Sequence, residues 1–227
     1  DGQSSQTSAK IGTRLGEDGG FIRVGTEYKD RNPTNRAGYD GFADTPGQRN
    51  FAMGDGLARD VNVWFNSELP VGDYKAYSFG TYNERHTTGS DFYREASEHP
   101  EFYPNGYLPQ SLGDNKDLSL TAGFKGMLDD DWDYDSSLTH GRNRFDGSTQ
   151  RTFNPSLGAD SPTRFNTGDY EFRQTTTNLD LSREVRLADR SFILAVGGEY
   201  RYENYLTFAG DPASYFGDGA DGSNGLR

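Results

Sequence analysis

The chain has 227 residues, a formal net charge of −12 and no cysteine. These properties exclude disulfide and thiolate chemistry, and the acidic balance argues against a general nucleic-acid-binding surface. Leu, Ile, Val and Phe make up less than a fifth of the residues, as in many disordered chains. However, aromatic residues amount to 14% and fall in alternating runs. A folded protein with a polar interior explains both observations, because each strand then needs apolar residues on one face only.

Alternation with a period of two predicts four β-hairpins along the chain. Each hairpin has apolar arms on both sides of a tight polar turn, and the turns recur at roughly 55–60 residues. The four predicted turns are Asp18-Gly19-Gly20, Gly72-Asp73, Asp129-Asp130-Asp131 and Ala188-Asp189-Arg190. The sequence therefore predicts about eight antiparallel strands in an up-and-down meander.

The fourth hairpin, at 175–209, shows the alternation most clearly. One face of its second arm is apolar and aromatic, and the other becomes charged toward the far end. The apolar series is Phe192, Leu194, Val196, Gly198, Tyr200, Tyr202, Leu206 and Phe208, interrupted by Asn204. The arm is also about twice the usual strand length of ~5–6 residues. This length indicates that the strand spans something wider than an ordinary soluble sheet.

The segments between hairpins are long and rich in Gly, Pro, Asn and Asp. They are 31–58, 87–116 and 146–174, each near thirty residues, and 211–227 follows the last hairpin. Loops of this length are uncommon in compact domains. Short turns at one end and long loops at the other are typical of a transmembrane β-barrel, with short periplasmic turns and long extracellular loops.

Aromatic residues on the apolar series fall near strand ends, where the girdles of a membrane barrel lie. These residues are Tyr28, Tyr74, Trp132, Tyr134, Tyr200 and Tyr202. In a soluble β-sandwich the same residues would pack across strands. The unequal connections favour the barrel, since a sandwich does not require them.

Several stretches resemble sequences of TonB-dependent outer-membrane receptors. They are Phe102-Tyr103-Pro104-Asn105-Gly106-Tyr107-Leu108-Pro109, Phe153-Asn154-Pro155, Ser161-Pro162-Thr163-Arg164-Phe165, Gly198-Glu199-Tyr200-Arg201-Tyr202-Glu203 and Ala209-Gly210-Asp211-Pro212-Ala213-Ser214-Tyr215. The resemblance extends over essentially the whole chain.

This resemblance implies a receptor in the outer membrane of a Gram-negative bacterium. Such a receptor has a 22-stranded barrel and a plug domain, and imports a scarce nutrient with energy coupled through TonB. Neither a plug nor a TonB box is visible in 1–227, so we expect an interior part of the barrel domain. The implied partners are outer-membrane lipid, the receptor's own plug domain, the TonB complex and a small-molecule nutrient, such as a siderophore or a sugar. No cofactor is implied.

Charged residues on the parity opposite the apolar series would line the lumen and could contact the plug. They are Arg14, Arg23, Glu27, Lys125, Glu199, Arg201 and Glu203, with Lys10 in the same class. For any one of them, a solvated lumen wall is an equally simple interpretation.

The loop at 91–109 is the candidate ligand site, because aromatic faces with polar tips suit a sugar or an aromatic siderophore. Its candidate ligand-binding residues are Tyr93, Arg94, Tyr103, Asn105 and Tyr107. The same aromatic residues could instead pack the loop onto its neighbours. His86, His99 and His140 lack metal-ligand spacing, and no catalytic constellation occurs, so neither a metal site nor an enzyme is predicted.

Two alternatives remain open at this stage. One is a self-contained eight-stranded outer-membrane barrel for adhesion or structure. The other is a soluble all-β binding domain, in which the apolar faces would turn inward. An interior barrel part predicts a curved, open meander whose first and last strands are unpaired at their outer edges, whereas a small barrel predicts a closed ring.

Overall fold

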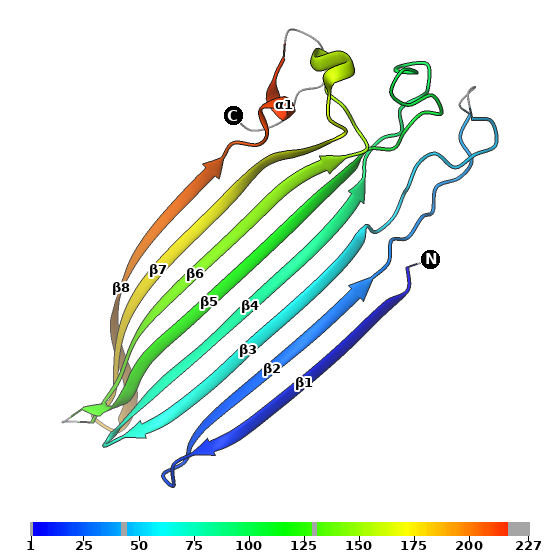
Figure 1. The fold of residues 1–227 in the computed structure, drawn as a ribbon. Helices are drawn as coiled ribbons and strands as arrows, with labels where there is room; N and C mark the ends of the chain where they lie inside the picture. The colour runs from blue at the N-terminus through cyan, green and yellow to red at the C-terminus, as the bar shows by residue number, and fades with distance from the viewer. Residues whose placement is uncertain (1, 42–44, 129–130, 218–227) are drawn as a thin grey trace.

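The computed structural model describes residues 2–41, 45–128 and 131–217, and they form one antiparallel sheet (Figure 1). The strands are β1 (Ser4–Leu15), β2 (Gly20–Arg31), β3 (Leu57–Val71), β4 (Tyr74–Ser90), β5 (Gln110–Leu128), β6 (Trp132–Gln150), β7 (Arg164–Leu187) and β8 (Arg190–Phe208). A short 3-10 helix, η1 (Pro155–Asp160), and one helical turn, α1 (Pro212–Tyr215), lie at the loop end. The predicted all-β meander of eight long strands is confirmed.

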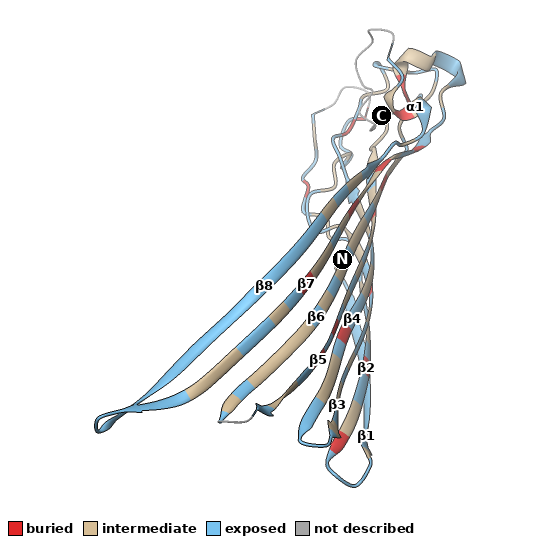
Figure 2. Cartoon of the chain, turned by 90° about the vertical axis from the view of Figure 1, so that its left-hand side faces the viewer, coloured by how far each residue is buried: buried red, intermediate tan, exposed pale blue. Residues whose placement is uncertain are grey.

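The strands are hydrogen-bonded in the order β1 to β8, each to its neighbours in sequence. Among the described residues, β1 pairs only with β2 and β8 only with β7, so the sheet is not closed. It curves across its width, and β7 and β8 turn away from β1 and β2 at the turn end (Figures 1 and 2). The predicted open meander with two free edges is therefore confirmed.

Tight turns at 16–19, 72–73 and 188–189 join the strands of three of the predicted hairpins. Gly72 and Ala188 begin two of these turns with positive φ angles of 61° and 56°, as two-residue hairpin turns of the II′ class require at their first central position. The third turn includes Asp129 and Asp130, which lie outside the described residues. All four short connections lie at one end of the sheet, which we call the turn end.

Two of the predicted loops are longer than the loops in the structure. The first, at 31–58, agrees with the gap between β2 and β3, but the other two shrink to 91–109 and 151–163. The flanking residues of the predicted loops 87–116 and 146–174 continue the strands instead. They are mostly polar, with scattered apolar or aromatic residues such as Leu112, Phe165 and Phe172, so the regular apolar alternation disappears there although the backbone pairing continues. Cross-strand contacts such as Arg144–Asp169, at 2.9 Å, hold these extensions together.

The sheet is staggered. β3 runs past Glu68, the partner of Phe21, to Val71, and β7 runs past Ser182, the partner of Asp133, to Leu187. Each turn therefore extends further than the one before it. A stagger of the hydrogen-bond register together with strand tilt is the geometry that allows a sheet to close into a barrel.

The sheet has no apolar core of its own in the described chain. The buried hydrophobic residues, Ala37, Tyr93, Phe153 and Phe165, lie in the loops or at the loop end of β7, whereas large apolar side chains along the strands are exposed. Figure 2 shows the strands mostly exposed or intermediate over their length. Among the described residues, no helix has the length and apolarity that a membrane crossing requires.

Candidate functional site

The two faces of the sheet differ sharply in polarity. Residues directly opposite each other in the register share a face, so the pairing assigns every strand residue to one of the two. Alternate residues of 7–15, 20–28, 61–71, 74–82, 118–128, 132–140, 175–187 and 192–202 form one contiguous surface, which we call the apolar band. The band contains no Asp or Glu, and Arg183 is its only Lys or Arg.

The apolar band is shorter than the strands. It covers 9 to 13 residues of each strand, whereas the strands have 12 to 24 residues. On the same face, just beyond the band toward the loop end, polarity changes abruptly to a charged belt. The belt consists of Asp30, Arg59, Glu84, His86, Asp114, Lys116, Arg142, Arg144, Asp146, Asp169, Glu171 and Arg173.

The boundary between band and belt crosses the sheet obliquely. On β2 and β3 the last band residues, Tyr28 and Val61, are direct partners. On β4, however, the partner of Val61 already belongs to the belt, and the band ends at Tyr82. On β5 the band ends at Leu118, but the partner of Leu118 on β6 is the belt residue Arg142. The boundary therefore moves toward the turn end a second time. A flat boundary that cuts across tilted strands produces steps in one direction, as seen here.

The six aromatic residues predicted as girdle residues all lie on the face of the band. Tyr200 and Tyr202 lie near its upper limit on β8, and Trp132 lies at its turn end on β6. The guanidinium of Arg183 lies 6.0 Å from the centroid of the Trp132 ring, close to the turn end. The one cationic side chain of the band therefore sits at its margin, where it can reach past the apolar surface.

All seven residues predicted to face the lumen lie on the opposite, polar face of the sheet. They are Arg14 and Arg23, Glu27 and Lys125, and the β8 trio Glu199, Arg201 and Glu203. The structure does not bring them together, because they spread from β1 to β8. The polar face thus carries charged side chains from β1 to β8.

Most of these residues form ion pairs or hydrogen bonds across the polar face. Lys125 pairs with Glu68 at 2.7 Å across the intervening strand β4 and lies 5.3 Å from the centroid of the Tyr77 ring. Glu27 pairs with Lys29 at 2.9 Å. On β8, the guanidinium of Arg201 lies 2.8 Å from the carboxylate of Glu199.

Tyr77 and Phe79 explain why the outgoing arm of the second hairpin alternates poorly. Both lie on the polar face, where their rings stack with centroids 6.3 Å apart. The hydroxyl of Tyr77 donates to Asp135 at 2.6 Å. A polar face that carries aromatic rings hides the period of two in the sequence.

The loop at 91–109 folds on itself and onto the next loop. Arg94 and Tyr107 exchange backbone hydrogen bonds of 2.8 and 2.9 Å, and the hydroxyl of the buried Tyr93 donates to the carbonyl of Asn105. Tyr103 stacks on Tyr107 with centroids 4.2 Å apart. The structure thus gives these three tyrosines a packing role within the loop.

Phe153 is the centre of the contact between the two loops. It is buried against Phe102, His99 and Tyr107, with ring centroids 4.6, 4.4 and 5.9 Å away. The hydroxyl of Tyr103 donates to the Thr152 carbonyl at 3.1 Å. Burial raises the pKa of both Tyr103 and Tyr107, so their hydroxyls stay protonated donors.

A cavity of about 840 Å³ opens between these loops and the polar face of the strands. Of the five predicted ligand residues, Arg94 and Tyr107 line it, while Tyr93, Tyr103 and Asn105 do not. Its wall also includes Phe92, His99 and Phe145. A concave site with aromatic walls and a few polar groups is the usual form of a small-molecule site.

An aromatic row that sequence reasoning missed leads away from this cavity along the polar face. Phe145, Tyr170 and Tyr205 come from β6, β7 and β8, with successive ring centroids 6.5 and 6.2 Å apart. Tyr205 is largely exposed. The row could be found only from the register, because its members are far apart in sequence.

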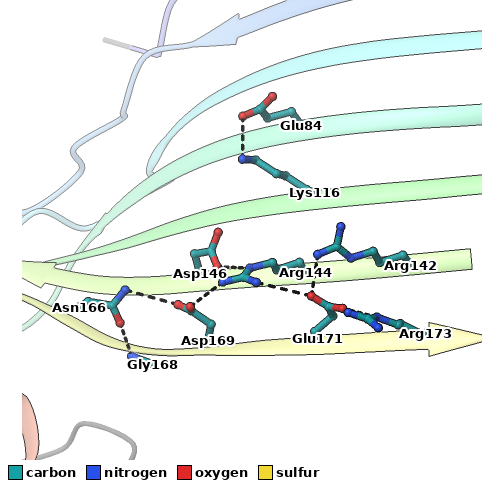
Figure 3. Close-up of polar contacts among 10 residues, drawn as sticks. All are labelled: Glu84, Lys116, Arg142, Arg144, Asp146, Asn166, Gly168, Asp169, Glu171 and Arg173. Carbon is teal, nitrogen blue, oxygen red and sulfur yellow. Dashed lines mark hydrogen bonds and ion pairs between the residues drawn. The ribbon is translucent and has the colours of Figure 1, made fainter. Parts of the chain in front are cut away.

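Among the described residues, the most buried charged one lies in the belt, on the face of the apolar band. Glu171 is 1% exposed and pairs with Arg142 at 2.7 Å and with Arg173 (Figure 3). Hydrogen bonds from these two guanidinium groups lower the pKa of Glu171 to about 2. Arg144 bridges Asp146 and Asp169 in the same network.

No model of a known protein family matches the chain, and the search of curated proteins finds no match. Within the described ranges, no three His, Asp or Glu side chains come together as a metal site would need. Function is therefore inferred from the two faces, the belt and the loop-end cavity.

Proposed function

We propose that this chain is part of the β-barrel of a TonB-dependent receptor, which binds a scarce nutrient and imports it across the outer membrane. The observation that carries the membrane assignment is the apolar band. A span of 9 to 13 residues in strands tilted near 45° is roughly 20–30 Å high, which matches the ~25 Å apolar surface of a membrane barrel. In this assignment the loop end is extracellular and the turn end periplasmic.

The free edges of β1 and β8 support a barrel with more strands than eight. In lipid, every backbone N–H and C=O needs a partner, so neither edge can remain unpaired. Further strands must complete the ring in the intact protein. A self-contained eight-stranded barrel is less favoured, because the described sheet does not close on itself.

The polar face supports a lumen that holds a plug domain. Its wall carries charges of both signs from β1 to β8, including Arg23, Lys125 and Glu199. In a soluble all-β domain the apolar band would have to be covered by a second layer. The described chain offers no such layer, and the height of the band matches a membrane rather than a domain core.

The loop-end cavity is the proposed place of nutrient contact on this part of the barrel. Arg94 supplies a cation and Tyr107 an aromatic ring and a hydroxyl, while Phe145, Tyr170 and Tyr205 extend the aromatic surface into the lumen. Aromatic faces with few polar groups suit a siderophore or a sugar. The complete site would include the plug and the remaining loops.

An uptake experiment tests this function. Cells with and without the gene would be supplied with labelled iron chelates and oligosaccharides under starvation for each nutrient. We expect the intact gene to support uptake of one class, and a protonophore to abolish it, because import depends on the proton gradient. Uptake that persists after the gradient collapses would contradict TonB coupling, and unchanged uptake of every nutrient in the deletion strain would contradict the receptor function.

A matched pair of variants then tests the cavity. Arg94→Gln removes a cation that lines the cavity, whereas Arg36→Gln removes one from the neighbouring loop 32–56, outside the cavity. We expect weaker nutrient binding only in the first variant. Equal affinities in the two variants would exclude Arg94 from the binding site.

A further inference from the structure

The charged belt is ordered in rows where β6 and β7 pair. Arg142 lies opposite Arg173 in the row next to the apolar band. Arg144 lies opposite Glu171 in the following row, and Asp146 opposite Asp169 in the row after that (Figure 3). The charges of the three rows sum to zero, but the basic row is adjacent to the band and the acidic row is furthest from it.

The basic row places two like charges directly opposite each other, an arrangement that is unfavourable without a shared anion. Glu171 supplies that anion from one side only, the side toward the loop end. Arg142 uses Nη2 and Arg173 uses Nε to reach it. Neither arginine has another ion-pair partner among the described residues, and their side chains are 44% and 50% exposed.

The row ends in a polar residue on β8. Asn204 is the direct partner of Arg173, and its Oδ1 is the one buried side-chain polar atom without a hydrogen-bond partner in the described part of the chain. The two guanidinium groups and this amide stand immediately above the band. This level is where lipid headgroups begin if the band faces the hydrocarbon.

We propose that Arg142 and Arg173 bind the phosphate of an anionic lipid in the leaflet that surrounds the loop end. Guanidinium groups bind phosphate through paired, charge-assisted hydrogen bonds, and basic side chains close to a membrane surface attract anionic headgroups. The phosphate takes the side of the arginine pair that Glu171 leaves open. This inference rests on the proposed membrane location of the apolar band, but not on the identity of the nutrient.

Substitution of Glu171 should change phosphate binding and protein stability in opposite directions. Its carboxylate competes with the phosphate for the same two guanidinium groups. Glu171→Gln therefore strengthens phosphate binding. In the absence of lipid the same substitution lowers the free energy of unfolding, because Arg142 and Arg173 then face each other without their anion. A belt with a purely structural role predicts only the loss of stability.

The test uses the protein produced from its full coding frame and purified in detergent. It is titrated with nanodiscs of phosphatidylcholine alone and of phosphatidylcholine containing phosphatidic acid. Each basic residue near an anionic surface raises the affinity for that surface about fivefold. The double variant Arg142→Gln with Arg173→Gln should therefore weaken the preference for phosphatidic acid roughly 25-fold. Arg59→Gln is the matched control for a general charge effect, because Arg59 is a similarly exposed, ion-paired belt residue next to the band on β3. Its loss should weaken the preference at most about fivefold.

Three results support the proposal together: the double variant weakens the preference roughly 25-fold, the Arg59 variant weakens it at most about fivefold, and Glu171→Gln increases it. If the double variant does not fold, Arg173→Gln alone and the Glu171 variant carry the test. Equal preference in wild type and double variant would overturn the proposal. Failure of the wild type to enter either nanodisc would instead contradict the membrane assignment, and this inference with it.

Discussion

The sharpest prediction compares two neighbouring residues on opposite faces of β8. Val196 lies in the apolar band and Ala195 on the polar face, and both are exposed in the described sheet. Val196→Arg and Ala195→Arg introduce the same side chain one residue apart. If the band faces lipid, only the first places a charge in the hydrocarbon.

The expected loss of stability follows from the depth of Val196 within the band. Val196 lies four residues above Phe192 and six below Tyr202, the limits of the band on β8. At ~3.3 Å per residue and a 45° tilt, these separations are roughly 9 and 14 Å along the membrane normal. Arg near the midplane of a membrane barrel costs about 2–4 kcal/mol. Ala195→Arg faces a polar wall and should stay within about 0.5 kcal/mol, as surface substitutions usually do.

The assay is the free energy of unfolding by urea of the intact protein folded in phospholipid vesicles. Tyr202→Arg adds a depth control, because charge near the interface costs only about 0–1 kcal/mol. The predicted order of cost is Val196→Arg first, then Tyr202→Arg, then Ala195→Arg. Equal costs for Val196→Arg and Ala195→Arg would refute the assignment of this face to lipid.

The remaining predictions concern packing, pH and the loops. A Cβ on Gly25 would overlap the ring of Trp64, whereas Gly198 has open space, so Gly25→Ala should destabilise by about 1–3 kcal/mol in urea unfolding and Gly198→Ala should not. Because the folded-state pKa of Glu171 is about 2, below its ordinary 4.5, its ion pairs stabilise the protein above pH 4.5. That contribution is lost as the pH falls toward 2, so the stability difference between wild type and Glu171→Gln should shrink over this range; a pH-independent difference would contradict the pairing. Phe153→Ala removes the ring that joins loops 91–109 and 151–163, and should speed proteolysis in both loops without changing cleavage at the turn end; unchanged cleavage in 91–109 would exclude the contact.

The alternation in the sequence predicted the strands where one face is apolar. It located all four hairpins and assigned Glu199, Arg201 and the other lumen candidates to the face opposite the apolar band. It failed toward the loop end of β4 to β7, where most residues on both faces are polar and ion pairs such as Arg144–Asp169 join the strands. The composition of such a polar strand segment does not distinguish it from a loop.

The loop-end site could be predicted only in part. An aromatic, polar composition identified the loop at 91–109, and Arg94 and Tyr107 do line the cavity. The roles of Tyr93 and Tyr103 depend on contacts with Asn105 and Thr152 that composition cannot show. The aromatic row on β6 to β8 and the buried position of Glu171 depend on register, which emerges only when the strands pair.

The most direct test uses the two tryptophans of the chain. Trp132 lies on the face of the apolar band, and Trp64 lies on the polar face over Gly25. Single-tryptophan proteins, made with Trp64→Phe or Trp132→Phe, would be folded into vesicles of brominated phosphatidylcholine. The membrane assignment predicts strong bromine quenching of Trp132 and little quenching of Trp64. Absence of quenching at Trp132, or equal quenching of the two, would contradict it.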